Sequence, residues 1–261
     1  MTTRPLIIAN WKMNPRTRRA ARELAAHAGR VLRRMRGVEV ALAVPFPFLE
    51  TVRRAAGHVR LAAQDVFSKP EGPFTGAVSP PMLRDFSVSY CIVGHSERRR
   101  HFGETDASVN QKVKALLAAG ITPVVAIGED TSEANAVVPK TLAIQLHGAL
   151  HGIPRRLVRR VVVAYEPVWA ISTNPNARPD TPDNATRRAI YIRKLLAKMA
   201  GIAVANNMRI LYGGSANARN AAGFIADDIR GMDGLLVGGA SIRADEFDAL
   251  IRSVGLRRRR A

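Results

Sequence analysis

The feature that most constrains the fold of this chain is an alternation of strand-like and helix-like segments, repeated about eight times along its length. Short apolar runs rich in β-branched residues predict buried strands, and the amphipathic stretches that follow them predict helices. No linker rich in Gly, Ser or Pro interrupts the series. Eight β-then-α units predict an α/β fold: a single closed parallel (β/α)8 barrel over residues 1–261, with a basic tail at 257–261. We expect strands at 6–13, 38–44, 59–63, 89–93, 121–127, 161–165, 209–212 and 234–237. We also expect one helix that ends at Arg36, a short helix that begins after Pro47, and helices over 106–119, 139–150 and 182–200.

The main alternative fold is an open, doubly wound parallel sheet. Such a sheet normally carries a glycine-rich turn after its first strand, where the pyrophosphate of a dinucleotide binds. The turn here is Asn10-Trp11-Lys12-Met13-Asn14, which contains no glycine. The sequence therefore favours the closed barrel and predicts no dinucleotide cofactor.

The charge balance of the chain is unusual. Lys and Arg number 40 against 21 Asp and Glu, which gives a formal net charge of +19. Such an excess can indicate a nucleic-acid partner. Many of the arginines, however, fall along the helix-like stretch 16–36 without interleaved aromatic residues. We interpret them as solvated helix faces that attract anions, and we expect no nucleic-acid partner.

The remaining composition bounds the cellular setting. No apolar run is long enough for a membrane span or a signal peptide, so a cytoplasmic protein with no membrane partner is expected. The single cysteine, Cys91, lies inside the apolar run 88–93. One cysteine excludes an internal disulfide and a multi-cysteine metal site, and its setting predicts a buried, inert thiol.

Polar residues and glycine pairs gather at the predicted strand ends. Barrels of this kind build their active sites at the carboxyl ends of the strands. Each residue alone has a plain structural explanation, such as a surface charge or a turn, but their joint occurrence at one rim indicates an active site. The residues are Asn10 and Lys12 after the first strand, His95 and Glu97 after the fourth, Glu166 after the sixth, Gly213-Gly214-Ser215 after the seventh, and Gly238-Gly239 after the eighth.

Glu166 is the candidate catalytic base. Pro167 fixes its own φ and biases the preceding residue toward an extended backbone, so the carboxylate starts from a restricted position. A carboxylate can remove a proton from a carbon next to a carbonyl when donors stabilise the developing oxyanion. Asn10, Lys12 and His95 are such donors. With no Ser or Cys nucleophile paired with a base and no cluster of metal ligands nearby in the sequence, we predict proton transfer without a cofactor or metal.

The glycine pair at 238–239 indicates what the substrate carries. Two consecutive glycines that lead into a helix leave backbone N–H groups uncovered, and both hydrogen bonding and the helix dipole favour an anion there. The loops after the seventh and eighth strands are the usual phosphate site of such barrels. A phosphorylated small-molecule substrate is therefore expected.

Several spaced motifs make the chain similar to the triosephosphate isomerase family. They are Ala-Asn-Trp-Lys-Met-Asn at 9–14, Gly-His-Ser-Glu-Arg-Arg at 94–99, Phe-Gly-Glu at 102–104, Ala-Tyr-Glu-Pro-Val-Trp-Ala-Ile at 164–171, Tyr-Gly-Gly-Ser at 212–215 and Val-Gly-Gly-Ala at 237–240. The resemblance spans nearly the whole chain. It implies a TIM barrel and the interconversion of dihydroxyacetone phosphate and D-glyceraldehyde 3-phosphate through an enediolate, a step of glycolysis and gluconeogenesis.

The resemblance also implies a role for each catalytic residue. By position, Glu166 would move the proton between C1 and C2. His95, kept neutral at a helix N-terminus, would polarise the carbonyl and transfer protons between the oxygens. The family is itself the standard example of such a neutral histidine. Lys12 would stabilise negative charge, and Asn10 would hydrogen-bond the same edge. Glu97 would hold Lys12, although an acid favoured by the dipole of a helix first turn explains its position nearly as well.

Two loops complete the site that the resemblance implies. Ser172, Ser215, Gly238 and Gly239 would supply N–H groups to the phosphate, and residues 167 to about 178 would form a closing lid that shields the enediolate from water. The loop 64–80 resembles an arm that docks into a second subunit beside Asn10 and Lys12, which predicts a homodimer; alternatively, the loop folds back on its own chain. The lid residues are Pro167, Val168, Trp169, Ala170, Ile171 and Thr173, and the arm carries Phe74, Thr75 and Gly76.

The lid is where the sequence departs from the family. Gly-Thr-Gly usually follows the motif at 164–171, whereas this chain has Ser172-Thr173-Asn174 with Pro175 and Pro179 beyond, and the lid is about two residues longer. Such changes stiffen a segment that has to move. An isomerase of a four-carbon ketose phosphate would share the catalytic residues and alter mainly this lid, and it is the first alternative function. A basic nucleic-acid-binding barrel and a catalytically silent scaffold are more remote, because neither explains why the catalytic side chains and the phosphate turns occur together.

Overall fold

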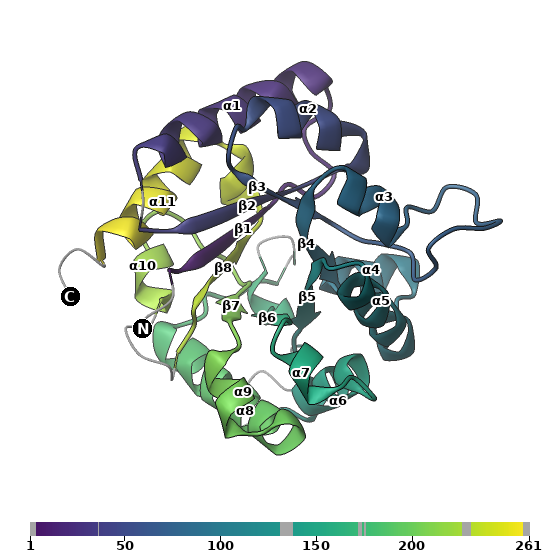
Figure 1. Ribbon diagram of the computed structural model, residues 1–261. Coiled ribbons are helices and arrows are strands. Elements are labelled where there is room, and N and C mark those ends of the chain that lie inside the picture. The colour runs from purple at the N-terminus through teal and green to yellow at the C-terminus, as the bar shows by residue number, and fades with distance from the viewer. Residues whose placement is uncertain are drawn as a thin grey trace.

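Eight parallel strands close into a barrel with helices around it (Figure 1). The computed structural model describes residues 4–35, 37–130, 138–171, 174, 176–225 and 231–257. The strands pair in chain order, and β8 closes the barrel against β1. The predicted (β/α)8 TIM barrel is confirmed. The strands are β1 Leu6–Asn10, β2 Glu39–Val44, β3 Arg60–Ala63, β4 Val88–Val93, β5 Thr122–Ile127, β6 Val162–Tyr165, β7 Ile210–Tyr212 and β8 Gly234–Val237.

The first strand is shorter than predicted. It was expected to run to Met13 but ends at Asn10. Lys12 has a φ of 52°, in the left-handed region, which is incompatible with a strand. The Asn10 side chain accepts a hydrogen bond from the Lys12 N–H at 3.0 Å, which stabilises this sharp turn.

The expected helices are present, with further short helices between them. The first ends at Arg33 instead of Arg36, because Arg34 is its C-cap; Arg36 lies outside the described residues. Thr17, Thr105 and Thr181 begin helices by accepting hydrogen bonds from backbone N–H groups of the first turn. The helices are α1 Arg18–Arg33, α2 Leu49–Ala55, α3 Pro80–Asp85, α4 Ser96–Phe102, α5 Asp106–Ala118, α6 Lys140–Leu150, α7 Arg155–Val158, α8 Pro182–Ala200, α9 Ile202–Asn207, α10 Ala221–Phe224 and α11 Ala244–Arg257, with 3₁₀ turns η1 Phe46–Phe48, η3 Val168–Ala170 and η4 Gly239–Ile242.

Strand residues alternate between two buried layers. Ile8 lies in a cluster inside the barrel, whereas Ile7 and Ala9 belong to the larger cluster between the strands and the helices. Both faces of the sheet are therefore apolar, as parallel strands require. Cys91 belongs to the outer layer and is fully buried, as predicted. Among the described residues, no helix has the length and apolarity needed to cross a bilayer.

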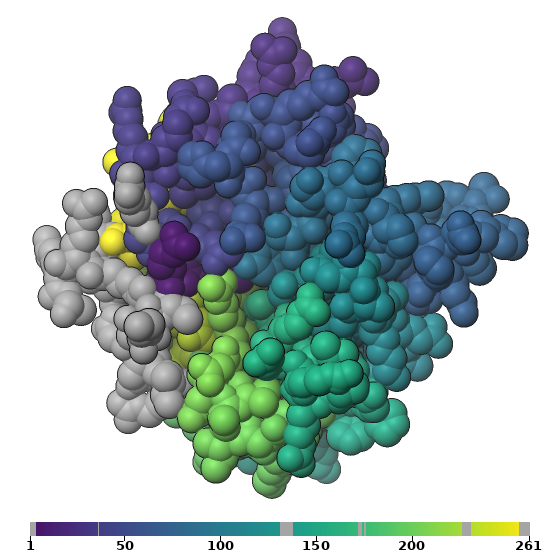
Figure 2. All heavy atoms as spheres, viewed as in Figure 1, coloured from purple at the N-terminus to yellow at the C-terminus, as the bar shows by residue number. Residues whose placement is uncertain are grey.

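The segment 64–80 projects from the barrel wall as a separate arm (Figures 1 and 2). Its two legs contact each other: the Phe67 N–H donates to the Val78 carbonyl at 2.8 Å, and the rings of Phe67 and Phe74 lie 4.6 Å apart. Residues 69–76 are exposed. The tip of the arm is thus not folded back on its own barrel, contrary to the alternative considered above.

Candidate active site

A cavity of about 270 Å³ opens at the carboxyl ends of the strands. It brings together residues from loops that are far apart in the sequence. The predicted residues among its lining are Asn10, Lys12, His95, Glu166, Ile171, Gly213, Gly214, Ser215, Gly238 and Gly239, and the others are Ala216, Asn217, Leu236, Ala240, Arg243 and Glu246.

His95 and Glu166 form the buried centre of this cavity. The side chain of His95 is 8% exposed and that of Glu166 only 3%. The Nε2 atom of His95 lies 3.0 Å from Oε1 of Glu166, and the Ser96 N–H donates to Oε2 at 3.2 Å. Both carboxylate oxygens are therefore held by donors at the start of α4, from its N-cap His95 and its first residue Ser96, which fixes the carboxylate against the imidazole.

The position of His95 at the start of α4 sets its tautomer. The Glu97 N–H points at Nδ1 at 3.2 Å, so Nδ1 accepts a hydrogen bond and carries no proton in this arrangement. The neutral ring then carries its proton on Nε2 and donates it toward Glu166. The Asn10 amide nitrogen lies 3.4 Å from the same Nε2 atom. The one ring proton therefore faces the cavity.

The two ionisable groups shift each other's pKa. Burial would lower the pKa of His95, but the adjacent Glu166 carboxylate outweighs burial and raises it. The Glu97 N–H opposes that rise, since an imidazolium has no lone pair at Nδ1 to accept it. Burial would raise the pKa of Glu166, but His95 and the Ser96 N–H more than offset it, so the pKa of Glu166 is lowered. Glu166 is thus ionised at neutral pH and can accept a proton.

Lys12 reaches the cavity from a tightly held turn. Its Nζ atom lies 2.5 Å from Oε1 of Glu97. Its carbonyl accepts a hydrogen bond from the Gln64 side chain at 2.9 Å, and a Cβ placed on Gly238 would lie 3.3 Å from its Cε atom. Glu97 therefore contacts Lys12 and also occupies the first turn of α4, so its position is consistent with both explanations given above.

Two glycines leave the space that Glu166 occupies. A Cβ on Gly213 would lie 2.7 Å from Cγ of Glu166, and a Cβ on Gly128 would lie 1.7 Å from its carbonyl oxygen. Real Cβ atoms do not approach other atoms so closely. The backbones that follow β5 and β7 must therefore be glycine at these points for the carboxylate to reach His95.

Glycine turns line the other end of the cavity. Gly238 precedes η4, whose first residue is Gly239, and a Cβ on Gly239 would meet open space. The Ser215 N–H and hydroxyl both donate to the Ala170 carbonyl, at 3.3 and 2.7 Å. Ser215 therefore lines the cavity, but its N–H and hydroxyl donate to the carbonyl of Ala170 in the predicted lid. Ser172 lies outside the described residues.

The first part of the lid is docked on the barrel. The Val168 N–H donates to the Glu129 carbonyl at 3.0 Å, and the indole N–H of the buried Trp169 lies 3.4 Å from the Glu129 carboxylate. The Asn174 amide closes the turn by donating to the Val168 carbonyl at 3.1 Å. Pro167, Ala170 and Ile171 complete this part of the lid, and Thr173 lies outside the described residues.

Residues 5–254 match the family model described as Triosephosphate isomerase. The chain belongs to the triosephosphate isomerase family. Relatives of that name include the protein of Thermus thermophilus, which is 44% identical over 97% of this chain and 99% of its own length. That of Carboxydothermus hydrogenoformans is 41% identical over 95% and 98%. That of Geobacter metallireducens is 40% identical over 95% and 97%.

Family membership makes the chain an intramolecular aldose-ketose isomerase. Several residues that shape this triosephosphate isomerase site were not predicted from the sequence. Gln64 directly follows β3 and Glu129 follows β5 after one glycine, so a closer look at all eight strand ends would have found both. Asn217 and Arg243 also line the cavity, but they stand beyond the strand ends in stretches without a distinguishing pattern. Within the described ranges, no group of three or more His, Cys, Asp or Glu side chains is placed to hold a metal ion.

Proposed function

We propose that this chain is a triosephosphate isomerase that interconverts dihydroxyacetone phosphate and D-glyceraldehyde 3-phosphate without a cofactor. The observation that carries the proposal is the buried contact between the Glu166 carboxylate and the His95 Nε2 atom, 3.0 Å apart, in a cavity that also holds Lys12 and two glycine turns. This arrangement combines a base, an oxyanion donor, a fixed positive charge and a place for phosphate. The family match gives it a substrate.

Glu166 acts as the base in this proposal. It removes the proton from the carbon next to the carbonyl and returns it to the neighbouring carbon, since its lowered pKa keeps it ionised at neutral pH. The negative charge that develops on oxygen is stabilised by the Nε2 proton of His95, the Lys12 ammonium and the Asn10 amide. The substrate carbonyl oxygen must displace Glu166 from the ring to accept a hydrogen bond from Nε2, which frees the carboxylate for the carbon-bound proton. In the enediolate, His95 gives the Nε2 proton to that oxygen and takes a proton back from the neighbouring hydroxyl, so the proton moves between the two oxygens and the ring is restored.

The phosphate end of the proposed site uses backbone donors. Gly238 and Gly239 line the cavity, and their N–H groups would donate to the phosphate, which is also attracted by the positive charge of the chain. Ser215 joins them when its N–H leaves the Ala170 carbonyl, and Ser172 is the fourth donor implied by the resemblance. Lid closure over the phosphate keeps water from the enediolate.

A homodimer is part of the proposal. The exposed arm carries Phe74 at its tip, where the residue is 40% exposed, and Thr75 and Gly76 follow it. Met13, next to Lys12, is 92% exposed, and Phe102 at the end of α4 is 69% exposed. Apolar groups this exposed are expected to be covered by another surface, and an arm inserted beside Lys12 on a second copy would cover them. We propose the cytoplasm as the location of this dimer.

The proposal is tested by measuring isomerisation of D-glyceraldehyde 3-phosphate and of a tetrulose phosphate by the natural chain. We expect fast turnover of the triose, loss of at least about 1,000-fold in kcat for Glu166→Gln because a general base is removed, and no change for Glu23→Gln on the exposed face of α1. Turnover of the four-carbon substrate alone would move the function to the alternative isomerase. Turnover of neither would contradict the proposal.

A further inference from the structure

A separate cavity opens at the amino ends of the strands, at the opposite end of the barrel from the proposed active site. It has a volume of about 220 Å³ and lies where β5, β6 and β7 begin. Three of the residues that line it are arginines, and none of the described residues that line it is Asp or Glu. This amino-end cavity therefore has an excess of positive charge. Its polar residues are Tyr90, Thr122, Arg159, Arg160, Asn207 and Arg209.

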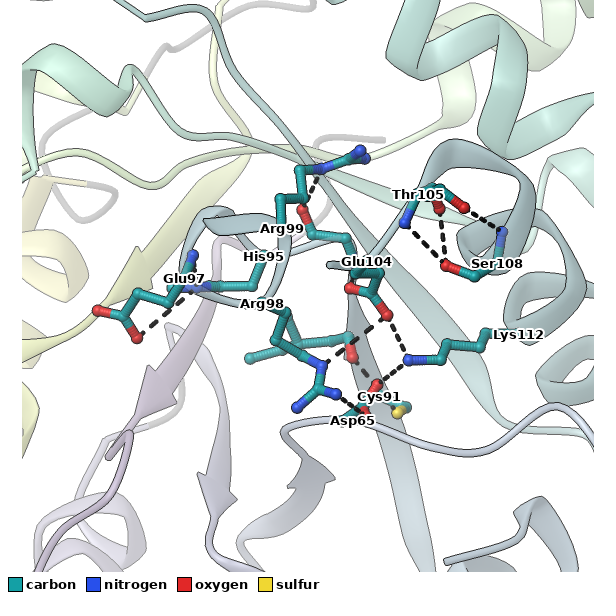
Figure 3. A network of polar contacts seen from close by, with 12 residues as sticks. Asp65, Cys91, His95, Glu97, Arg98, Arg99, Glu104, Thr105, Ser108 and Lys112 are labelled. Atoms are coloured by element: carbon teal, nitrogen blue, oxygen red, sulfur yellow. Dashed lines mark hydrogen bonds and ion pairs between the residues drawn. The ribbon is translucent and has the colours of Figure 1, made fainter. Parts of the chain in front are cut away.

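Cations elsewhere in the barrel are paired with carboxylates. The Lys112 ammonium contacts both Asp65, at 2.6 Å, and Glu104, and Arg98 pairs with Asp65 at 2.8 Å (Figure 3). Such partners offset part of the cost of removing a charge from water. At the amino-end cavity, by contrast, no ion pair joins Arg159 or Arg160 to a carboxylate among the described residues. These two arginines are therefore suited to hold an anion that comes from outside the chain.

The backbone that carries these two arginines forms a fixed turn. Arg159 is the C-cap of α7, and the Arg160 N–H donates to the Leu157 carbonyl at 2.9 Å. The Val161 N–H donates to the Val158 carbonyl, also at 2.9 Å, directly before β6. A ligand would therefore not have to order the backbone on which both side chains stand, which lowers the cost of binding.

Arg209 reaches the same cavity from the start of β7. Its Nη1 atom donates to the Glu39 carboxylate at 2.8 Å, and its side chain is 24% exposed. Glu39 also pairs with Arg60 at 3.0 Å, so one carboxylate is shared between two arginines. A guanidinium group has more N–H donors than this contact uses. Glu39 therefore orients Arg209 without neutralising the positive charge at this end of the barrel.

We propose that the amino-end cavity binds an anion that carries a diphosphate group, either inorganic pyrophosphate or the diphosphate of a nucleotide. Guanidinium groups bind phosphate oxygens through two parallel N–H donors. Three arginines around one cavity match the several charges of a diphosphate better than the single phosphate of a triose. The excess of 40 Lys and Arg over 21 Asp and Glu adds a long-range attraction for anions. This inference goes beyond the proposed function and does not depend on it.

The test is calorimetric titration of inorganic pyrophosphate into the natural chain, Arg159→Gln, Arg160→Gln and the double variant. We expect the natural chain to bind with a Kd below about 1 mM, since several charge-assisted contacts form at once. Each single variant should bind about tenfold more weakly, because one such contact is lost. Arg159 and Arg160 are at least partly exposed, so the variants should fold, which circular dichroism verifies.

The matched control is the double variant Arg18→Gln/Arg22→Gln on the exposed face of α1. It removes the same charge from another part of the surface and should bind pyrophosphate like the natural chain. Equal weakening in the two double variants would overturn the inference, because binding would then reflect only the overall charge.

Two further ligands identify what the cavity takes. Orthophosphate should bind at least about tenfold more weakly than pyrophosphate, because it reaches fewer arginines. Equal affinity for orthophosphate would contradict a diphosphate site. ADP separates the two sources of the diphosphate: tighter binding than pyrophosphate assigns the site to a nucleotide, and equal or weaker binding assigns it to inorganic pyrophosphate.

Binding at the proposed active site is measured separately. Pyrophosphate bound there would inhibit isomerisation of D-glyceraldehyde 3-phosphate competitively, which gives an inhibition constant. The double variant Arg159→Gln/Arg160→Gln should keep this constant and the natural kcat while it loses the additional binding detected by calorimetry. Binding by this variant as tight as by the natural chain would overturn the inference. If the natural chain does not isomerise the triose, the proposed function fails, and the titrations of the variants still decide whether the amino-end site exists.

Discussion

The Nε2 atom of His95 lies 3.0 Å from Oε1 of Glu166, so the proposed electrophile and the proposed base contact each other directly. The carboxylate raises the pKa of the ring against the opposing effect of burial. Glu166→Gln removes that negative charge and keeps the shape of the side chain. We expect the pKa of His95 to be lower in Glu166→Gln than in the natural chain, measured by NMR titration of the imidazole. An equal pKa in both proteins would mean that the contact does not form in solution.

Gly213 provides a test of the space needed by Glu166. A methyl group there would lie 2.7 Å from Cγ of Glu166 and 3.1 Å from the Tyr165 carbonyl oxygen. We expect Gly213→Ala to displace the carboxylate and to lower kcat about 100-fold, since misplacement by about 1 Å costs this much. Gly223→Ala is the matched control, because its methyl group would make only an ordinary contact of 3.4 Å with Pro182. Equal activity in the two variants would show that Glu166 does not need this space.

A Glu97→Gln variant distinguishes two explanations of why Glu97 lies beside Lys12. If Glu97 holds Lys12, Glu97→Gln weakens the 2.5 Å contact and lets the ammonium move, so kcat should fall about tenfold or more. If Glu97 serves only as a favourable acid in the first turn of α4, the change should cost about 0.3–1 kcal/mol of stability and leave kcat unchanged. Steady-state kinetics together with thermal unfolding of the same variant decide between them.

Cys91 should be inert in the folded protein. It lies on β4 with no exposed surface, and burial raises the pKa of its thiol well above the ordinary value. The thiolate is the reactive form, so both access and ionisation are suppressed. We expect no reaction with an aromatic disulfide reagent until a denaturant unfolds the chain, followed by modification of one thiol per chain. Rapid labelling of the native protein would contradict the buried position.

The success of the sequence analysis at the strand ends has a physical reason. Asn10, His95 and Glu166 each lie at the end of a buried apolar strand or within two residues of it. They are recognisable in the sequence because a polar residue in that position has no place in either core layer. The order of the motifs then placed these residues at one rim. The turn at Lys12 was not predicted because lysine, unlike glycine, does not indicate a positive φ.

The contacts between loops could not be predicted from the sequence. Gly213 was predicted at the active-site rim, but its contact with Glu166 on the neighbouring strand end was not predicted. Glu104 stands ten residues after Gly94, and only the folded loop brings its carboxylate to that N–H. Such contacts depend on loop conformation, which strand and helix periodicity does not determine.

A second buried ion cluster lies where β2 begins, at the opposite end of the barrel from the active site. One oxygen of the Glu39 carboxylate accepts from the Tyr90 hydroxyl at 2.6 Å and the other from Arg209 at 2.8 Å, and Arg60 lies 3.0 Å away. The side chain of Glu39 is only 11% exposed. Burial would raise the pKa of Glu39, but these partners outweigh it and lower the pKa, while the same contact and burial raise the pKa of Tyr90 to about 12.

The sign of the pH dependence follows from the lowered pKa. A carboxylate with a lower pKa in the folded than in the unfolded chain stabilises the fold above its ordinary value of 4.5, and the contribution is lost as pH falls through the folded pKa. We expect Glu39→Gln to lower the free energy of unfolding by about 1–3 kcal/mol at pH 7, measured by chemical denaturation at fixed protein concentration. The difference from the natural chain should shrink toward pH 3. The control Glu50→Gln, at an exposed ion pair on α2, should leave the free energy of unfolding unchanged at both pH 7 and pH 3. If the difference between Glu39→Gln and the natural chain grew on acidification, the Glu39 carboxylate would not be stabilised in the folded barrel.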